Sequence, residues 1–440
     1  MQDYFYTLAD AITALLKGDE VYTCTFRGED SDFVRFNRSA VRQAGTVAQR
    51  FVNLDLIRGQ RHAAADVALA GDLEEDRGRL AQAVAALREQ LPYLPEDPHL
   101  LYATEVQSSV QAGANRLPDS AAAVAAVLEA GRGQDLVGFY AAGCIYAGFA
   151  NAFGQRNWFA SYSFNCDWSL YYQADKAVKT AYAGVVWEPE EFARKVDTAA
   201  AQLEQLQQAP RTIPPGRYRV YVAPAALDDI LHTLAWGGFG LKDHRTKQTT
   251  LLKMVEEGAH LHPAVTLREN TRDGVAPNFQ GAGFIKPDQV TLIEAGVFRN
   301  CLVSPRSAKE YGVPTNAASG RETPQSLEMA AGDMPRQEVL QRLDTGVYMN
   351  NVWYLNYSDR SACRMTGMTR FATFWVEPGV IQAPLNVMRF DESIYRMLGE
   401  HLLGLPAERE LVLNTSTYHQ RSTGSSRVPG ALIDDFNFTL

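Results

Sequence analysis

Amide and aromatic side chains gather in one short segment of the C-terminal half, between residues 348 and 357. An Asn side chain donates and accepts hydrogen bonds, so it can bind a peptide backbone without regard to the peptide's sequence. Aromatic rings add apolar contact area. The residues concerned are Asn350, Asn351, Trp353, Tyr354 and Asn356. The pattern predicts a strand that holds an extended peptide, and an ordinary strand near the core fits it equally well.

Three histidines stand where a metal ion or a substrate could bind. His260 and His262 would face the same side of a strand, where a third donor could complete a metal site. Gly258 and Pro263 flank this pair and favour a surface loop instead. His232 lies on a predicted amphipathic helix. We expect it either to contact substrate or to be a core histidine bonded to the backbone.

The sequence lacks the usual signatures of serine hydrolases and nucleotide-binding proteins. It contains no Gly-x-Ser-x-Gly, no Gly-x-x-x-x-Gly-Lys-[Ser/Thr] and no Gly-x-Gly-x-x-Gly. Gly237, Gly238 and Gly240 follow a predicted helix rather than a strand, so we expect them to end that helix. Neither class of function has support from these motifs.

The composition is that of a globular protein without affinity for nucleic acid or membrane. A length of 440 residues suggests two domains. The formal net charge of −9, without any basic run, argues against nucleic-acid binding and fits a cytoplasmic protein. No apolar run approaches the roughly 18 residues of a membrane span, and the N-terminus lacks the pattern of a secretory signal. The 5 scattered cysteines are expected to be reduced and mostly buried.

The N-terminal half shows the periodicities of helices and antiparallel strands. Helices are predicted at Tyr4–Leu16, from Asp72 onward, at Asp119–Ala130 and at Pro189–Gln208. Strands are predicted at Val21–Arg27, Phe33–Arg38, Thr46–Ile57, Leu136–Phe149 and Asn157–Tyr172. Proline and glycine then interrupt the pattern between residues 210 and 216. We therefore divide the chain into an N-terminal α+β domain, residues 1–212, and a β-rich C-terminal domain, residues 213–440.

The C-terminal half opens with a strand at 217–222, followed by the helix that carries His232. Hairpins are predicted at 290–300 and 371–383, and a short helix at Asp391–Leu402. The segments Tyr348–Tyr357 and Phe371–Val376 are expected to be exposed sheet edges that accept a further strand. The fold class is thus α+β.

Four blocks of the C-terminal half resemble motifs of one protein family. Leu292–Phe298 is similar to "L-x-E-x-G-x-L", Ser307–Val313 to "S-A-R-x-x-G", Phe374–Ile381 to "F-W-V-E-N-G-x-I", and Arg427–Pro429 to "S-V-P". Each block alone is common, but their order and spacing together are specific. They resemble the TldD/PmbA (TldD/TldE) metallopeptidase family, which implies a β-rich C-terminal domain of the TldD/PmbA type.

The resemblance also indicates which branch of the family the chain is most like. In the catalytic TldD branch, a helix carries His-Glu-x-x-x-His and a Cys near the C-terminus adds a ligand. Here His232 matches the first His, but Thr233 and Gly237 replace the Glu and the second His, and the last cysteine is Cys363. Zinc-like sites need three or four protein donors. The chain therefore resembles the metal-free TldE/PmbA branch, with no catalytic residue, metal ligand or cofactor of its own.

A TldE-like chain implies a heterodimer. A TldD-like catalytic subunit would hold a zinc-like metal, and this chain would help to hold a peptide or an unfolded protein segment. The expected substrate-binding residues are His232, Asn350, Asn351, Trp353, Tyr354 and Asn356. Two other hypotheses remain: a stand-alone peptide-binding or regulatory protein, and an independent peptidase whose site the sequence does not reveal.

Overall fold

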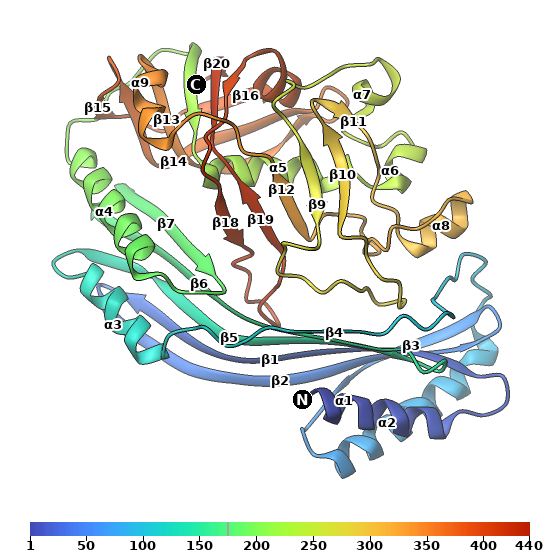
Figure 1. The fold of residues 1–440 in the computed structure, drawn as a ribbon. Helices are drawn as coiled ribbons and strands as arrows, with labels where there is room; N and C mark the ends of the chain where they lie inside the picture. Colours follow the sequence, from blue (N-terminus) through green and yellow to red (C-terminus); the bar gives the residue numbers. More distant parts are fainter. Residues whose placement is uncertain (174–175) are drawn as a thin grey trace.

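The computed structural model describes residues 1–173 and 176–440, which form three β-sheets with flanking helices. Figure 1 shows a long curved sheet from the N-terminal half lying beneath a compact C-terminal half. Its order is β3-β2-β1-β5-β6-β4, with β7 paired to part of β6, and all pairs except β4–β6 are antiparallel. The strands are β1 (Val21–Asn37), β2 (Ala40–Arg58), β3 (Arg61–Ala68), β4 (Ser109–Ala112), β5 (Asp135–Asn151), β6 (Arg156–Gln173) and β7 (Lys176–Gly184).

The predicted α+β class is confirmed, but two predicted strands are one. Val21–Arg27 and Phe33–Arg38 belong to the single strand β1, because the polar residues between them keep pairing with β2 and β5. Glu29 and Ser31 in this stretch are buried. A polar stretch looks like a loop in the sequence, but here another part of the chain covers it.

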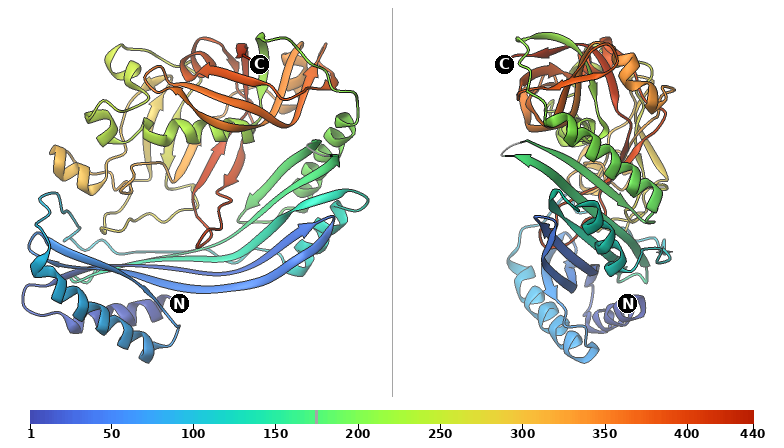
Figure 2. Two further views of the ribbon diagram at one scale, coloured as in Figure 1. Left: turned by 180° about the vertical axis from the view of Figure 1, so that it is seen from behind. Right: turned by 90° about the vertical axis from the view of Figure 1, so that its left-hand side faces the viewer.

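Helices α1 (Gln2–Leu15) and α2 (Leu73–Gln90) lie on the face of the long sheet that is turned away from the C-terminal half (Figure 2). The two helices pack together, and their Phe5, Leu8 and Leu80 share a core with β1 and β2. The Asp72 side chain caps α2 by accepting from Glu74 N and Glu75 N. The remaining helices of this half are α3 (Ser120–Ala130), α4 (Pro189–Leu206) and the short 3₁₀ turn Leu91–Tyr93.

The C-terminal half contains two sheets that share one core. The six-stranded sheet has the order β11-β10-β9-β12-β19-β18. Its strands are β9 (Leu267–Asn270), β10 (Gln289–Glu294), β11 (Val297–Phe298), β12 (Ser326–Met329), β18 (Glu410–Leu413) and β19 (Ser425–Val428). The hairpin predicted at 290–300 is confirmed as β10–β11.

The other C-terminal sheet closes on itself. Its order is β13-β8-β20-β16-β14-β15, β17 pairs with β20, and β13 also pairs with β14, which closes a ring. Its strands are β8 (Gly216–Val222), β13 (Gly346–Asp359), β14 (Arg364–Val376), β15 (Ile381–Pro384), β16 (Arg389–Ser393), β17 (Leu402–Gly404) and β20 (Ala431–Phe438). The hairpin predicted at 371–383 is confirmed as the ends of β14 and β15.

Helix α5 (Pro224–Gly238) crosses this half and is the predicted helix that carries His232 (Figure 1). Leu227, Ile230 and Leu234 on its apolar face lie in the core shared with both C-terminal sheets. Its regular geometry ends at Gly237, whose φ of 83° favours glycine, as predicted. The shorter helices are α6 (Leu241–Arg245), α7 (Leu252–Glu256), α8 (Pro305–Tyr311), α9 (Val339–Leu343) and a 3₁₀ turn at Arg336–Glu338.

The short helix predicted at Asp391–Leu402 is confirmed only in its middle. Its first three residues belong to β16, which pairs with β14, and its last residue begins β17. Residues 394–400 are helical, and Arg396–Glu400 among them forms a π-helix. Buried Phe390 and Glu392 alternate as a strand requires, and this pairing overrides the local helical pattern.

A loop at residues 414–424, between β18 and β19, reaches down to the long sheet and joins the two halves (Figure 1). Its Arg421 is only 4% exposed and donates to Ser31 Oγ at 3.2 Å and to Ser163 O and Oγ at 2.8 and 3.0 Å. Burial lowers the pKa of Arg421 to about 10, although nearby Glu29 favours its charge. The loop thus anchors a charged side chain inside the interface of the two halves.

Other sequence expectations can be checked briefly. Cys24, Cys144, Cys166, Cys301 and Cys363 are all free, and four of them are buried, as predicted. Within residues 1–173 and 176–440, no helix is long and apolar enough to cross a membrane. The domain boundary at 212/213 stays a prediction.

Candidate functional site

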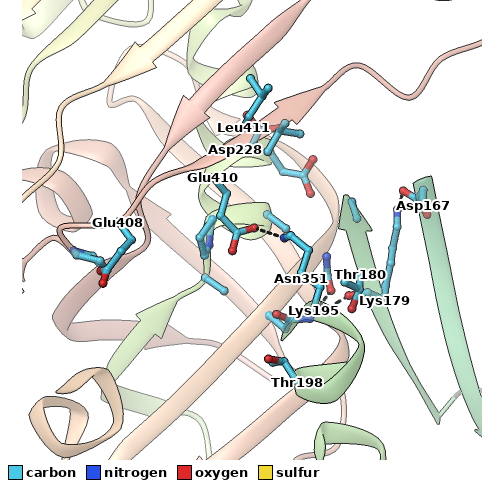
Figure 3. Close-up of a pocket in the computed structure, with 18 of the residues that line it drawn as sticks. Asp167, Lys179, Thr180, Lys195, Thr198, Asp228, Asn351, Glu408, Glu410 and Leu411 are labelled. Atoms are coloured by element: carbon cyan, nitrogen blue, oxygen red, sulfur yellow. Dashed lines mark hydrogen bonds and ion pairs between the residues drawn. The ribbon is translucent and has the colours of Figure 1, made fainter. Parts of the chain in front are cut away.

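A cavity of about 470 Å³ lies between the two halves of the molecule. Five elements form most of its wall: β7 and α4 from the N-terminal half, and α5, β13 and β18 from the C-terminal half. Figure 3 shows charged and polar side chains from these elements pointing toward one another. The site therefore exists only because both halves are present.

One wall is a turn of α5 that carries Asp228, Asp229 and His232. Asp228 is buried, accepts a hydrogen bond from Ser426 Oγ, and lies 3.1 Å from His232 Nδ1 through its Oδ1. The hydrogen bond to Asp228 outweighs burial and raises the pKa of His232 to about 9. The imidazole is thereby held in one orientation with a positive charge, and half of its side-chain surface stays exposed.

Asp229 follows Asp228 and faces the same cavity. Burial among the cavity walls, followed by repulsion from Asp228, raises the pKa of Asp229 to about 6. No ion pair to the Asp229 carboxylate occurs within the described part of the chain. It stands three residues before His232, so one helical turn offers both a carboxyl group and an imidazolium to a ligand.

The opposite wall joins α4 to β18 through a charge pair. Lys195 Nζ lies 2.9 Å from Glu410 Oε2, as Figure 3 shows. Burial alone would raise the pKa of Glu410, but Lys195, Arg336 and Arg194 together hold it below its ordinary value. The two arginines lie 3.9 and 4.0 Å from the same carboxylate. In this wall, one carboxylate is therefore surrounded by three cations.

Two strands that border the cavity are sheet edges. In the described residues, β18 pairs only with β19, and β7 pairs only with β6. A paired edge strand keeps outward N–H and C=O groups on its free side. Some of these are satisfied by asparagines: Asn350 Nδ2 donates to Lys179 O, and Asn165 Nδ2 to Leu413 O. The other edge groups of β7 and β18 can serve a ligand backbone.

The structure brings together three of the six predicted substrate-binding residues. His232, Asn350 and Asn351 line the cavity, whereas Trp353, Tyr354 and Asn356 are exposed on β13 outside it. His260 is exposed and His262 accepts from Ala264 N, and both lie in a loop, as predicted. Their roles in binding stay predictions.

The predicted edges are only partly confirmed. Within the described residues, β13 pairs with both β8 and β14 only at residues 347–349, and from residue 351 onward it pairs with β14 alone and is an edge. In the segment Phe371–Val376 of β14, residues 374–376 pair with β13 on one side and β15 on the other, a closure that no local sequence pattern reveals. Tyr354 lies in a bulge between the paired residues Trp353 and Asn356, so a proline there would remove no ladder hydrogen bond.

Several cavity residues went unnoticed in the sequence. The pair Asp228 and His232 had a signal, because residues four apart share a helix face. Lys195 and Glu410 had none, since 215 residues separate them along the chain. Only the tertiary structure makes them neighbours.

The donors around His232 do not fit a zinc-like ion. Thr233 uses its hydroxyl to donate to Asp229 O, and Gly237 has no side chain. Across residues 1–173 and 176–440, no group of three or more His, Cys, Asp or Glu side chains is placed to hold a metal ion. Tetrahedral sites need three or four such donors.

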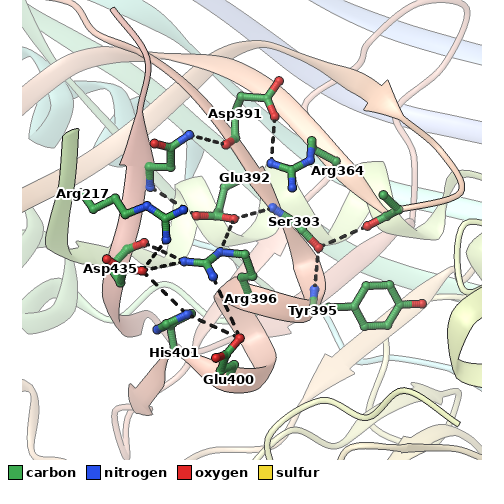
Figure 4. A network of polar contacts seen from close by, with 12 residues as sticks. Arg217, Arg364, Asp391, Glu392, Ser393, Tyr395, Arg396, Glu400, His401 and Asp435 are labelled. Carbon is green, nitrogen blue, oxygen red and sulfur yellow. Dashed lines mark hydrogen bonds and ion pairs between the residues drawn. The ribbon is translucent and has the colours of Figure 1, made fainter. Parts of the chain in front are cut away.

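A second charged cluster lies at the far end of the ring-closed sheet (Figure 4). Arg396 donates to Glu392 Oε1 at 3.1 Å and to Asp435 Oδ2 at 2.7 Å, and Arg217 contacts the same Asp435 oxygen at 2.5 Å. Glu392 also accepts from Ser393 N and Asn437 N. These residues satisfy one another, and they do not line the cavity.

Solved structures with the same fold cover nearly the whole chain. A putative modulator of a DNA gyrase from Thermotoga maritima aligns with TM-score 0.74 at 14% identity, covering 99% of this chain and 100% of that one. TldE from Thermococcus kodakarensis aligns with TM-score 0.78 at 12% identity, covering 99% and 100%. A putative modulator of DNA gyrase from Bacteroides thetaiotaomicron gives 0.73 at 13%, covering 99% and 98%. At these identities the likeness establishes the fold alone.

Sequence comparison identifies the family. No curated protein matches the chain. The family described as "PmbA/TldA metallopeptidase C-terminal domain" matches residues 215–440, slightly more than half of the chain. This is the segment that contains α5, both C-terminal sheets and most of the cavity wall. The chain belongs to the PmbA/TldD metallopeptidase family.

Proposed function

We propose that this chain is the TldE-like, non-metal-binding subunit of a cytoplasmic, heterodimeric TldD/TldE-type peptidase, and that its cavity holds an extended peptide. The family supports a role in peptide chemistry. The fold shared with TldE from Thermococcus kodakarensis supports the choice of branch. The missing donors around His232 support a division of labour in which a TldD-like partner holds a zinc-like ion and activates water.

The observation that carries the proposal is the cavity bordered by two free strand edges, β7 and β18. Strand addition gives affinity through main-chain hydrogen bonds and tolerates many sequences. Asn350 and Asn351 add donors and acceptors that are equally indifferent to side chains. This combination suits an unfolded segment better than a single small molecule.

The α5 wall would bind the polar groups of the peptide backbone. His232 uses Nδ1 toward Asp228, which leaves Nε2–H to donate to a peptide carbonyl. Asp229, three residues earlier, would accept from a peptide N–H. Lys195 and Glu410 stay paired and fix the spacing of α4 and β18, so they position the edge without having to contact the ligand.

The test measures binding of fluorescent, unstructured peptides to the purified chain. Peptides N-methylated at every second residue lose the N–H groups on one edge of an extended strand. We expect one methylation register to abolish binding and the other to leave it nearly unchanged. Equal binding of both registers would exclude strand addition. Asn351→Ala should weaken binding about threefold to tenfold, and the matched Asn386→Ala, outside the cavity, should not.

A second measurement addresses the partner. The purified chain should leave peptides intact and should support chelator-sensitive cleavage only when a TldD-like protein is added. Cleavage by the chain alone would instead identify an independent peptidase. Peptide binding without any complex formation would favour the stand-alone binding protein.

A further inference from the structure

The wall of the cavity continues onto an exposed face of β13 and β14. Asn351 lines the cavity, and the register runs without a break from Asn351 opposite Arg370 to Trp353 opposite Met368. Because side chains alternate along a strand, Asn351 and Trp353 point to the same face, and Arg370 lies on that face beside them. A ligand that leaves the cavity past Asn351 therefore meets Trp353 and Arg370 next.

The Arg370 guanidinium lies against two aromatic rings. Its Cζ lies 4.4 Å from the Trp353 ring centroid and 5.0 Å from that of Phe371. No hydrogen bond or ion pair occupies it within residues 1–173 and 176–440. Stacking uses the flat faces of a guanidinium and leaves its edge N–H groups in plane and unfilled. Trp353 is 49% exposed, so a ligand can reach this side.

The backbone around this arginine is strained in a way that presents the aromatic rings. Phe371 has a φ of 58° and Tyr354 a φ of 55°, and both interrupt the β13–β14 register. Left-handed conformations cost about 1–3 kcal/mol for residues other than glycine and cluster at ligand sites. Tyr354 is 70% exposed and packs edge-on against Trp353 with centroids 4.7 Å apart. Two bulges thus place aromatic rings beside a cation that has no ion pair within the described residues.

We propose that Trp353, Arg370 and Phe371, with Tyr354 beside them, form an outer subsite that binds a carboxylate of the peptide held in the cavity. This inference rests on the proposed function. The carboxylate would accept from the edge of Arg370, and Tyr354 and Trp353 would contact an apolar neighbour of the acidic group. Trp353 lies two strand residues beyond Asn351, or about 7 Å, so the carboxylate falls about two peptide residues beyond the one bound at Asn351.

The molecule contains a second stacked arginine, which serves as a matched control. Arg211 Cζ lies 4.7 Å from the Trp375 ring centroid, but Arg211 also pairs with Glu377 at 3.6 Å. Glu377 therefore already neutralises the charge of Arg211. Arg211→Gln is therefore a suitable control for Arg370→Gln.

The experiment compares four fluorescent peptides of one apolar sequence. They carry a free C-terminal carboxylate, a C-terminal amide, an internal Glu with an amidated end, or an internal Gln with an amidated end. We expect the unmodified chain to prefer one or both acidic peptides over their neutral counterparts about tenfold. Arg370→Gln should remove that preference, and Arg370→Lys should keep only part of it, because Lys lacks the planar fork. Arg211→Gln should leave the preference intact.

The outcomes separate the subsite from the proposed function. If Arg370→Gln loses affinity only for the peptide with a free C-terminal carboxylate, the subsite binds a C-terminal carboxylate. If it loses affinity only for the peptide with an internal Glu, the subsite binds a side-chain carboxylate. If Arg370→Gln binds all four peptides as the unmodified chain does, or weakens all four equally, the subsite is wrong and the peptide cavity stands. If no peptide binds the unmodified chain, both proposals fail. Far-UV circular dichroism and Tm confirm that each variant is folded.

Discussion

Two charged clusters of the C-terminal half differ in how completely their members are paired. In the Arg396 cluster, made of Arg217, Glu392, Arg396 and Asp435, each charge has an opposite partner and the buried carboxylate also accepts backbone N–H groups. The cavity cluster is made of Asp228, Asp229, His232, Lys195 and Glu410. Lys195 pairs with Glu410 and Asp228 with His232, whereas the Asp229 carboxylate has no ion pair within the described residues and His232 uses only Nδ1 toward Asp228.

The difference suggests what each cluster is for. A satisfied network makes a structure unique and stable, whereas perturbed and incompletely paired groups tend to gather at functional sites. The Arg396 cluster joins β8, β16 and β20 at the end of the ring-closed sheet. In the cavity cluster, the Asp229 carboxylate and Nε2 of His232 are left for a bound ligand to pair with. Mutations in the Arg396 cluster should therefore affect stability without affecting binding, whereas mutations in the cavity cluster should affect binding as well as stability.

The largest effect is expected for Arg396→Met. It leaves the buried Glu392 carboxylate without its cation, which should lower the free energy of unfolding by about 3 kcal/mol. Urea unfolding measures the loss, and peptide affinity should not change under native conditions. The control is Arg342→Met, whose exposed pair with Glu338 should contribute less than about 0.5 kcal/mol. A loss no larger than that of the control would contradict a structural role for the cluster.

Glu410→Gln should cost less, about 1–2 kcal/mol, because Lys195 loses its charged acceptor but keeps part of its solvent contact. The cations around Glu410 hold its pKa below the ordinary value of 4.5. The stabilisation is thus present above that value and is lost as the pH falls through the lowered pKa. Unfolding at pH 7 and at about pH 3 should show the difference between variant and unmodified chain shrinking in acid. A difference that does not depend on pH would contradict this account.

Asp229→Asn should stabilise the chain while weakening peptide binding. The pKa of Asp229 is raised from 3.8 to about 6, so ionisation is less favourable in the folded state. Stability is therefore lost as the pH rises from about 4 through about 6, and Asn avoids this loss. Since the residue is exposed to the cavity, the gain at pH 8 should be at most about 1 kcal/mol. Asp197→Asn, at an exposed position on α4, is the control and should change little.

The smallest effect on stability is expected for His232→Gln. The pKa of His232 is raised from 6.5 to about 9, so its charge stabilises the folded chain fully below about pH 6.5 and not above about pH 9. The charged groups that act on the imidazole are Asp228 and Asp229 on its own helix, and Lys179 of β7, which acts on Asp229, lines the same cavity. The variant should be less stable by under about 1 kcal/mol at pH 6 and equal to the unmodified chain above pH 9. A constant difference across this range would show that His232 acts through packing rather than charge.

Much of the secondary structure could be predicted because its causes are local. Asp72 caps α2, Gly237 ends α5, and side-chain alternation marks β6, all within a few residues of each other. The fold class and the family motifs of the C-terminal half follow from the same kind of information. The strand β1 was predicted as two strands because its centre is polar. That centre is buried by the loop of Arg421, which lies almost 400 residues later in the chain.

The candidate site was only half predictable, for a related reason. Asn350, Asn351 and His232 have side chains whose chemistry suggests binding wherever they lie, and the fold placed them in one cavity. Trp353 and Tyr354 were grouped with them by sequence position, but both are exposed and neither lines the cavity. Lys195 and Glu410 could not be predicted as site residues, because they become neighbours only when α4 packs beside β18.

By itself, the sequence determined the longer helices and the long strands of the N-terminal half, the α+β class, the family resemblance and the absence of the His-Glu-x-x-x-His pattern at His232. These depend on residue types and on spacings of a few residues. The tertiary structure decided which strand edges stay free, because pairing with β8 and β15 covers the predicted edges only at residues 347–349 and 374–376, while the rest of β13, and β7 and β18, keep a free side within the described residues. It also decided which charges stay open, as at Asp229 and Arg370, since pairing depends on distances between residues that the chain order keeps far apart.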